Sequence, residues 1–334
     1  MFDNKTILIT GGTGSFGKRF TKIFLKKFPK IRKLIILSRD ELKQFEMSEK
    51  IEKKDFKKIR FLLGDIRDKD RLLMALKKVD YVIHAAALKQ VPTAEYNPFE
   101  FIKTNILGAQ NLIEACIVNN VKKVIALSTD KAAAPINLYG ATKLASDKLF
   151  ISANNIIGKN KISFSVVRYG NVLMSRGSVI PKFLENIRLN KNINLTHPDM
   201  TRFNISLDDG VNFVIFGLIK SIGGEIFVPK LPSFRIVDLI KSLSPKSKYH
   251  ISGIRSGEKL HEEMITISDS YNTIESKKFY IILPQGKIKI NKYLKKFKAK
   301  KTLKPFSYNS NENTHYLSSK DLKRIIDAEK KIKI

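Results

Sequence analysis

The sequence contains very little cysteine, few acidic residues and no long apolar run. Cys116 is its one cysteine, so no internal disulfide can form, and its place in the apolar stretch LIEACI indicates a core position. No apolar stretch approaches the ~20 residues needed to span a bilayer. The N-terminus, MFDNKTILITGG, lacks the basic region, apolar run and cleavage site of a signal peptide. These absences lead us to expect a soluble, cytoplasmic protein without a membrane span.

Basic residues outnumber acidic ones, with 62 Lys and Arg against 31 Asp and Glu and a formal net charge of +31. Such a balance is typical of proteins that bind nucleic acids or membrane surfaces. The lysines are nevertheless spread along the whole chain, and many fall on predicted exposed helix faces, as in FTKIFLKKF. We therefore interpret most of the charge as a solvated surface and do not expect a nucleic-acid partner. For the densest run, KIKINKYLKKFKAKKTLK, both interpretations stay open.

Short apolar runs alternate with helical patterns through the first half of the chain. The runs are KTILIT (5–10), KLIILS (33–38), RFLLGD (60–65), YVIHAA (81–86), KVIALST (123–129) and SFSVVRY (163–169). Continuous apolar runs, rather than alternating ones, are typical of parallel strands buried on both faces. Their alternation with helices predicts an α/β fold with a Rossmann-type, doubly wound parallel sheet.

The regular alternation ends near residue 170, which predicts a change of domain. We expect an NADP-binding Rossmann domain in residues 1–169 and a smaller C-terminal substrate-binding lobe in residues 170–285. Residues 208–229 contain a helical pattern and a strand pattern that would return to the main sheet. Residues 286–334 form a basic C-terminal segment that we expect to be partly disordered.

A glycine-rich turn, GGTGSFG, lies between the first predicted strand and the first predicted helix. Three of its four glycines, Gly11, Gly14 and Gly17, have the spacing that permits a tight turn and a close approach of the backbone to a pyrophosphate. The N-terminus of the helix would then face the phosphates with its N–H groups and the positive end of its dipole. The turn therefore predicts a dinucleotide site.

The second predicted strand ends in LSRDELK, where the cofactor is selected. An acid at this point bonds the ribose 2′-hydroxyl of NAD, whereas an arginine accommodates the 2′-phosphate of NADP. Arg39 precedes Asp40, and Lys43 follows, so the cations favour NADP. Asp65, at the end of the third strand, either reaches the adenine or caps the following helix.

Tyr139 and Lys143 form a Tyr-x-x-x-Lys motif, which places both side chains on one helix face. A nearby ammonium lowers a tyrosine pKa, and the tyrosine can then exchange a proton with a substrate hydroxyl while hydride moves to or from nicotinamide. Thr129, at the end of the fifth strand, would bond the same substrate oxygen. Asp130 and Lys131 follow it, where ligands of parallel sheets bind.

Together these motifs resemble the extended short-chain dehydrogenase/reductases, and more narrowly the inverting UDP-N-acetylglucosamine 4,6-dehydratases of pseudaminic acid biosynthesis. The resemblance runs from the N-terminus to about residue 285. The stretches that carry it are ILITGGTGSFGK, SRDELKQ, HAAALKQVPTAEYNP, ALSTDKAAAPINLYGATKLASDKLF, SVVRYGNV, SRGSV, MTRF, GGEIFVPK and RSGEKLHEEMI.

The resemblance implies that C4 of the sugar is oxidised, water is lost across C5 and C6, and hydride returns to C6. Retaining relatives carry Asp-Glu after the threonine, whereas Asp-Lys is typical of the inverting group. By position, Asp130 is the acid for the 6-hydroxyl and Lys131 the base for C5. A lysine base must be neutral for part of the cycle, so we expect burial to lower the pKa of Lys131. The group that reprotonates C5 stays undefined.

The resemblance also implies the residues of each subsite and a tightly bound NADP that is regenerated in each cycle. For the cofactor they are Gly11, Thr13, Gly14, Ser15, Phe16, Gly17, Ser38, Arg39, Asp40, Glu41, Leu42, Lys43, Asp65, Ile66, Ala85, Lys89, Thr104, Tyr139, Lys143 and Val172. For the UDP-sugar they are Lys89, Asn171, Arg176, Val179, Thr196, Arg202, Arg255 and Glu258. Arg202 and Arg255 would clamp the diphosphate, since arginine engages phosphate bidentately. A homo-oligomer is implied, and the histidine spacing predicts no metal site.

Some positions depart from the family pattern, and other functions stay open. The departures are Gln90, Ala134, Met174, Asn204 and Ser256, none of which removes a catalytic group. A UDP-hexose 4-epimerase or another nucleotide-sugar dehydratase of the same fold is the near alternative, although an epimerase needs no acid and base at C5 and C6. A non-catalytic NADP-binding or nucleic-acid-binding protein is the distant one, in which Asp130 and Lys131 form only a surface ion pair.

Overall fold

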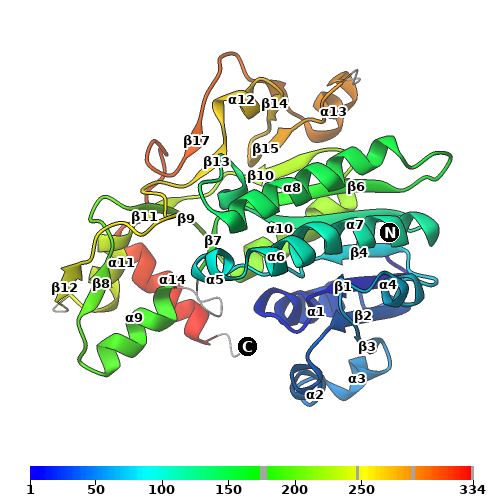
Figure 1. The fold of residues 1–334 in the computed structure, drawn as a ribbon, viewed down its shortest axis with the longest axis horizontal. Helices are drawn as coiled ribbons and strands as arrows, with labels where there is room; N and C mark the ends of the chain where they lie inside the picture. The colour runs from blue at the N-terminus through cyan, green and yellow to red at the C-terminus, as the bar shows by residue number, and fades with distance from the viewer. Residues whose placement is uncertain (174–178, 246–247, 287–289, 332–334) are drawn as a thin grey trace.

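The computed structural model of the chain describes residues 1–173, 179–245, 248–286 and 290–331. A ten-stranded sheet forms their centre, in the order β16-β14-β15-β10-β6-β5-β4-β1-β2-β3 (Figure 1). Its strands are β1 (Thr6–Thr10), β2 (Lys33–Ser38), β3 (Ile59–Leu63), β4 (Tyr81–His84), β5 (Lys123–Thr129), β6 (Ser163–Tyr169), β10 (Ile226–Pro229), β14 (Thr273–Glu275), β15 (Phe279–Ile282) and β16 (Lys300–Lys301). From β3 through β10 every neighbouring pair is parallel, and the remaining pairs are antiparallel. The predicted doubly wound α/β fold is confirmed.

The parallel strands form where apolar runs can be buried on both faces. Every residue of β1 and of β4 is buried. Helix α1 (Ser15–Lys27) packs against α10 (Leu207–Lys220), whereas α4 (Lys69–Ala75), α7 (Gly108–Val118) and α8 (Leu138–Ser152) pack in a second row. Because the strand order reverses between β1 and β4, the crossovers place these two rows on opposite faces (Figure 1).

Residues 98–118 form three consecutive helical segments. They are α6 (Pro98–Phe101), the π-helical η1 (Ile102–Leu107) and α7. A π-helical turn inserts extra backbone into a helix and often accompanies a functional site. Here it buries Thr104 and Asn105 next to the carboxyl ends of the strands.

A smaller lobe lies beyond the carboxyl ends of the strands. It contains a three-stranded sheet, β11-β9-β7, and the pair β12-β8. These strands are β7 (Asn171–Val172), β8 (Ile193–Leu195), β9 (Thr201–Ile205), β11 (Ser233–Arg235) and β12 (Tyr249–Ile251). Its own apolar core includes Ile180, Phe183, Phe234, Leu239 and Leu322. This second core gives the smaller lobe a scaffold separate from the main sheet.

The basic C-terminal segment contains regular structure, so the expected partial disorder is not met in the part that the structure describes. It comprises α13 (Ile290–Phe297), β16, β17 (Tyr308–Asn309) and α14 (Ser319–Lys331). In α14, Leu322 and Ile326 are 0% and 1% exposed and pack against α11 (Ile236–Leu243). The apolar residues of α14 recur at helical spacing within a lysine-rich sequence. We expected disorder because the average composition of this sequence is polar and basic, and an average does not reveal the spacing.

The remaining elements are short or lie at the edges of the fold. They are α2 (Glu41–Ser48), α3 (Lys53–Phe56), α5 (Val91–Tyr96), η2 (Asp130–Ala132), η3 (Ala153–Asn155), α9 (Val179–Arg188), β13 (Glu263–Ile265) and α12 (Ile267–Ser270). None of the helices in the described ranges is long and apolar enough to cross a membrane.

Candidate active site

Two cavities open at the carboxyl ends of the parallel strands. One has a volume of about 1530 Å³ and lies over the glycine turn and the ends of β2, β4 and β5. The other has a volume of about 730 Å³ and lies against the smaller lobe. Lys131 and Asn171 line both, as do Gln90 and Val172. The predicted base therefore stands where the two cavities meet.

The glycine turn leads the chain from β1 into α1 along the floor of the larger cavity. Gly11 has φ of +64°, and a Cβ there would lie 2.9 Å from the backbone nitrogen of Ala86. Gly14 precedes the first residue of α1, and no side chain caps the helix. The backbone at this helix end can thus approach a ligand closely, as a dinucleotide phosphate requires.

Most of the residues predicted for the cofactor line the larger cavity. They are Gly11, Thr13, Gly14, Ser15, Phe16, Ser38, Arg39, Asp40, Lys43, Ile66, Ala85, Lys89, Thr104, Tyr139, Lys143 and Val172. The hydroxyl of Thr104 is buried there without a hydrogen-bond partner in the protein. A buried polar atom of this kind favours a polar ligand. The residues present therefore fit a dinucleotide.

Four of the predicted cofactor residues, Gly17, Glu41, Leu42 and Asp65, do not line this cavity. The carboxylate of Asp65 instead accepts hydrogen bonds from the backbone and side chain of Arg67. It also lies 3.5 Å from Arg39 Nη1. The capping role considered for Asp65 belongs to Asp68, whose side chain caps α4.

Asp40 serves the helix that it precedes. Its side chain caps α2 by accepting a hydrogen bond from Lys43 N, at 2.9 Å, and also pairs with the Lys43 ammonium. The guanidinium of Arg39 is half exposed at the cavity edge. Lys43 thus pairs with the residue that caps its own helix, whereas Arg39 precedes the helix and lies near Asp65.

Thr129 ends β5 and starts the short turn η2. Its hydroxyl donates to Asp130 Oδ1 at 2.8 Å. Asp130 is 1% exposed, and its second oxygen, Oδ2, has no partner in the protein. Burial raises the pKa of Asp130, and this outweighs the opposing effect of Lys131. A carboxyl group in this state is suited to donate a proton.

Tyr139 and Lys143 lie on α8 and face the larger cavity. Burial raises the pKa of Tyr139 to about 12, although the charge of Lys131 opposes the shift. We expected Lys143 to lower the pKa of Tyr139, and this prediction is wrong for the protein without bound ligands. Lys143 donates to the backbone oxygen of Leu127 at 2.8 Å, and burial lowers its own pKa.

The start of α8 packs tightly against the turn that carries Lys131. A Cβ on Gly140 would lie 2.3 Å from the backbone oxygen of Lys131. Asn137 caps the helix by accepting from Gly140 N at 2.8 Å. Gly140 therefore fixes the separation of Tyr139 from Lys131. No prediction from the sequence included this glycine, although it lies inside the Tyr-x-x-x-Lys motif.

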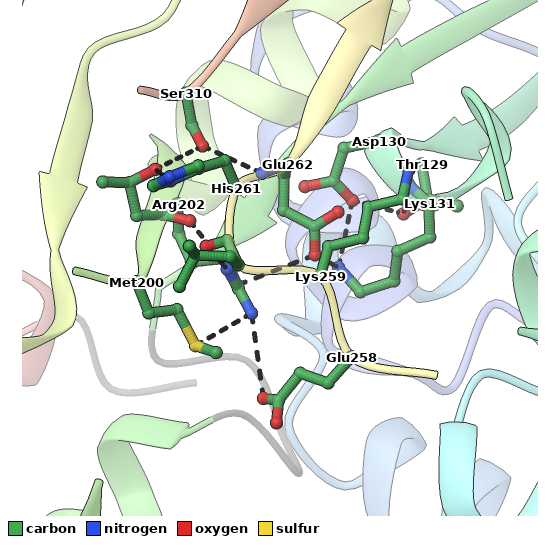
Figure 2. Close-up of polar contacts among 12 residues, drawn as sticks. Thr129, Asp130, Lys131, Met200, Arg202, Glu258, Lys259, His261, Glu262 and Ser310 are labelled. Carbon is green, nitrogen blue, oxygen red and sulfur yellow. Dashed lines mark hydrogen bonds and ion pairs between the residues drawn. The ribbon is translucent and has the colours of Figure 1, made fainter. Parts of the chain in front are cut away.

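Lys131 is held between two carboxylates. Its Nζ lies 3.1 Å from Asp130 Oδ1 and 2.9 Å from Glu262 Oε1 (Figure 2). Burial alone would lower the pKa of Lys131, but the two acids outweigh it and raise the pKa. The expected burial-lowered pKa is therefore wrong in the free chain. Glu262 was missed from the sequence, where its signal was a second acid four residues after Glu258.

Arg202 connects this cluster to the smaller cavity. Its Nε lies 3.6 Å from Glu262 Oε1, and its Nη2 lies 3.7 Å from Glu258 Oε1 (Figure 2). Nη1 donates to the backbone oxygen of Thr201 at 2.7 Å. The guanidinium thus reaches from the predicted diphosphate site to the acid that holds Lys131.

The residues predicted for the UDP-sugar separate between the cavities. Val179, Thr196, Arg202, Arg255 and Glu258 line the smaller one, Lys89 lines the larger one, and Asn171 lines both. Arg176 and the departure Met174 lie outside the described residues. Gln90 and Ser256 also line the smaller cavity.

The loop that carries Lys89 is fixed by Asn105 of η1. The Asn105 side chain accepts from Leu88 N and donates to Leu88 O, both at 2.9 Å, and donates to Thr142 of α8 at 3.1 Å. No motif in the sequence marked this residue. The contact shows how the π-helical turn ties the cavity wall to the helix of Tyr139.

The histidines show no sign of metal binding within the described ranges. His84 is 1% exposed, contacts the Thr10 hydroxyl at 2.9 Å, and has a pKa lowered by burial to about 3. No group of three or more His, Cys, Asp or Glu residues in this part of the chain could hold a metal ion.

Comparisons with known proteins identify relatives whose sequences match nearly the whole chain. A family model described as "Polysaccharide biosynthesis protein" matches residues 7–284. A Campylobacter jejuni protein (subsp. jejuni serotype O:23/36, strain 81-176) named UDP-N-acetylglucosamine 4,6-dehydratase (inverting) is 54% identical, over 98% of this chain and 98% of the relative. A Rickettsia bellii (strain OSU 85-389) protein named UDP-glucose 4-epimerase is 42% identical, over 98% of this chain and 96% of the relative. The X-ray structure of Pen from Bacillus thuringiensis superposes with a TM-score of 0.89 at 37% identity, covering 99% of both chains.

Proposed function

Since this chain belongs to the polysaccharide biosynthesis protein family and resembles its inverting UDP-N-acetylglucosamine 4,6-dehydratases, we propose that it catalyses their reaction. The observation that carries the proposal is the pairing of Asp130 with Lys131 at the end of β5. Both residues line the same cavity as Tyr139, and Lys131 also lines the cavity that contains Arg202 and Arg255. A carboxyl group and an amine at this point supply the acid and base that loss of water needs and that epimerisation at C4 does not.

The cofactor in this proposal is NADP, held along the glycine turn. Arg39 supports this choice because its half-exposed guanidinium lies at the edge of the larger cavity, where the ribose 2′-phosphate would be. When bound, the nicotinamide would supply the acceptor for the C4 hydrogen as hydride and the donor of hydride to C6. The role of the chain is to orient this exchange and to move the protons.

Each side chain then has a defined proton to move. Tyr139 accepts the proton of the 4-hydroxyl as a tyrosinate, a form that burial disfavours in the free chain and that the charge of Lys143 would favour in the complex. Lys131, as the neutral amine, takes the C5 proton that the C4 ketone has made acidic. The electron pair of the C5–H bond forms a C5–C6 double bond, and the 6-hydroxyl leaves as water with a proton from Asp130. Protonation of C5 from the opposite face gives the inverted centre.

The remaining assignments follow from this reaction. The enzyme is a lyase, and its product is UDP-2-acetamido-2,6-dideoxy-β-L-arabino-hexos-4-ulose. Arg202 and Arg255 hold the diphosphate in the smaller cavity. Residues 1–169 bind the cofactor, and residues 170–285 bind the sugar nucleotide. By the same resemblance the protein acts as a homo-oligomer and supplies a sugar for glycosylation.

Incubation of the purified protein with UDP-N-acetylglucosamine, followed by mass spectrometry, tests the proposal. A product lighter by one water supports it. A product of unchanged mass with an inverted C4 would instead establish the epimerase, the function named for the Rickettsia bellii relative. Absence of any reaction with UDP-sugars, in a protein that still binds NADP, would contradict both.

A further inference from the structure

Glu262 is a buried acid at the centre of the site to which the reaction described above gives no role. It is 2% exposed, and its Oε1 contacts the Lys131 ammonium at 2.9 Å (Figure 2). The second oxygen, Oε2, is buried without a hydrogen-bond partner in the protein. An ionised carboxylate in this position is costly unless its charge is used or neutralised.

The C-terminal segment fixes the position of Glu262. Its backbone N–H donates to Ser310 Oγ at 2.9 Å, and its backbone oxygen accepts from Ser310 N at 2.7 Å. The Ser310 hydroxyl also contacts the hydroxyl of Thr201 at 2.7 Å. Residues 262 and 310 therefore hold one another in place, and the carboxylate points to Lys131.

The proposed reaction needs two things that Asp130 cannot supply alone. Asp130 must carry a proton in order to donate it to the leaving 6-hydroxyl, and its burial favours that protonated form. Lys131 must lose a proton before it can accept the one from C5. With Asp130 protonated, Glu262 is the carboxylate in hydrogen-bond contact with Lys131 that can still accept it.

We propose that Glu262 accepts the Lys131 proton when the UDP-sugar binds, so that it is the positioning residue that turns Lys131 into a base. The inference rests on the proposed function. The proton passes from Lys131 Nζ to Glu262 Oε1, which leaves a neutral amine and a neutral carboxylic acid. After Lys131 has taken the C5 proton, that proton can pass to the Asp130 carboxylate across the 3.1 Å contact, which restores the neutral amine and the protonated Asp130. When the product leaves, the proton on Glu262 returns to Lys131 and the resting ion pair forms again.

Arg202 links this transfer to substrate binding. In the free chain, burial alone would raise the pKa of Glu262, but Lys131 and Arg202 outweigh it and lower the pKa. A diphosphate that engages Arg202 neutralises the guanidinium 3.6 Å from Glu262 Oε1, so the proton affinity of Glu262 rises. The other charged or titratable groups that act on Lys131 and Glu262 are Asp130, Tyr139, Lys89 and Lys259.

The test compares Glu262→Gln with Glu263→Gln in the full-length holoenzyme. Glu263 is the next residue, accepts from Ser307 at 2.6 Å and does not line either cavity, so it is a matched control. Two rates are followed: formation of reduced nicotinamide, which reports C4 oxidation, and loss of water from UDP-N-acetylglucosamine. For E262Q we expect C4 oxidation to persist and water loss to fall by about 100-fold near neutral pH, in the range of a lost proton-transfer group.

The pH profile separates this role from a structural one. In E262Q the Lys131 proton must leave to solvent, so water loss should recover as the pH rises toward the ordinary lysine range. A loss that is uniform across pH, a rate equal to wild type, or a faster rate would each overturn the inference. If E262Q does not fold, Glu262→Asp is used in its place. A shift to higher pH of the range in which the rate of water loss rises would support the role of Glu262, and an unchanged pH range would contradict it. A wild-type protein that dehydrates no UDP-sugar would overturn the proposed function itself.

Discussion

Arg168 Nη2 lies 3.2 Å from Asp147 Oδ2, and these side chains, 2% and 1% exposed, form a buried ion pair between β6 and α8. Ser128 of β5 donates to the same carboxylate oxygen at 2.6 Å. Arg168 also donates to the backbone oxygen of Met264 at 3.0 Å. The pair thus joins the helix of Tyr139 to the segment that carries Glu262.

Removing one partner of this pair should be strongly destabilising. Arg168→Met leaves the Asp147 charge buried and unpaired, and we expect the free energy of unfolding to fall by about 3–5 kcal/mol. The double variant with Asp147→Leu removes both charges and should lose less. Urea unfolding followed by circular dichroism measures both. If the free energy of unfolding falls equally in the two variants, or by less than ~1 kcal/mol in R168M, the ion pair does not stabilise the contact between α8 and the segment that carries Glu262.

Gly140→Ala should reduce activity without unfolding the protein. Its Cβ would meet the backbone oxygen of Lys131 at 2.3 Å, so either the turn or the helix must shift. A displacement of about 1 Å at a reacting group can cost about 100-fold in rate. The measurement is the rate of water loss from UDP-N-acetylglucosamine.

Gly210→Ala is the matched control for that variant. Gly210 lies in α10, where an added Cβ would make only contacts of 3.8 and 4.0 Å. We expect unchanged activity and a small gain in stability, because alanine is a better helix former than glycine. Loss of activity in both variants alike would remove the explanation given for Gly140.

Ala134→Gly should stabilise the protein. Ala134, one of the departures from the family pattern, has φ of +42°, which is unfavourable for a residue with a Cβ. Its methyl group is exposed, so little burial is lost. We expect a gain of about 0.5–1 kcal/mol in the free energy of unfolding. The exposed, helical Ala141 is the control, and A141G should lose about 1 kcal/mol. A loss of stability in A134G would show that the strain is absent.

Arg39→Ala should change the choice of cofactor. The variant removes a charged donor from the edge of the larger cavity, so binding of NADP should weaken by about 10- to 100-fold while binding of NAD stays nearly constant. Calorimetric titration of the cofactor-free protein with each nucleotide measures this. Arg60→Ala, an exposed residue of β3 that does not line the cavity, is the control. Equal weakening for both nucleotides would contradict the NADP assignment.

The sequence predicted those features that depend on local pattern. The apolar runs of β1, β2 and β4 indicated the parallel sheet because each run is continuous and almost fully buried. The run of β3 lies at the edge of the sheet, and only Ile59 of that strand is buried. The glycine turn and the Tyr-x-x-x-Lys motif correctly predicted residues that line the larger cavity, because each motif consists of residues that are close together in the sequence. The family resemblance is likewise confirmed by the 54% identity to the Campylobacter jejuni relative.

Other features depend on contacts between distant segments, which no local pattern encodes. Glu262 meets Lys131 across 131 positions of sequence because β13, which Glu262 directly precedes, packs against η2, and Ser310 then fixes it. Asp130 and Glu262 together raise the pKa of Lys131, and the contribution of Glu262 could not be predicted from the pair Asp130-Lys131 alone. The helix α14 was obscured for a different reason, because lysines surround its few apolar positions.

The most direct test of the central claim is proton NMR of the product formed from UDP-N-acetylglucosamine in D₂O. If Lys131 removes the C5 proton and C5 is reprotonated from the opposite face, the product carries deuterium at C5 and has the L-arabino configuration. Lys131→Met should abolish this labelling while reduced nicotinamide still forms. A product that retains the original C5 proton, or one with deuterium at C5 in the D configuration, would contradict the account.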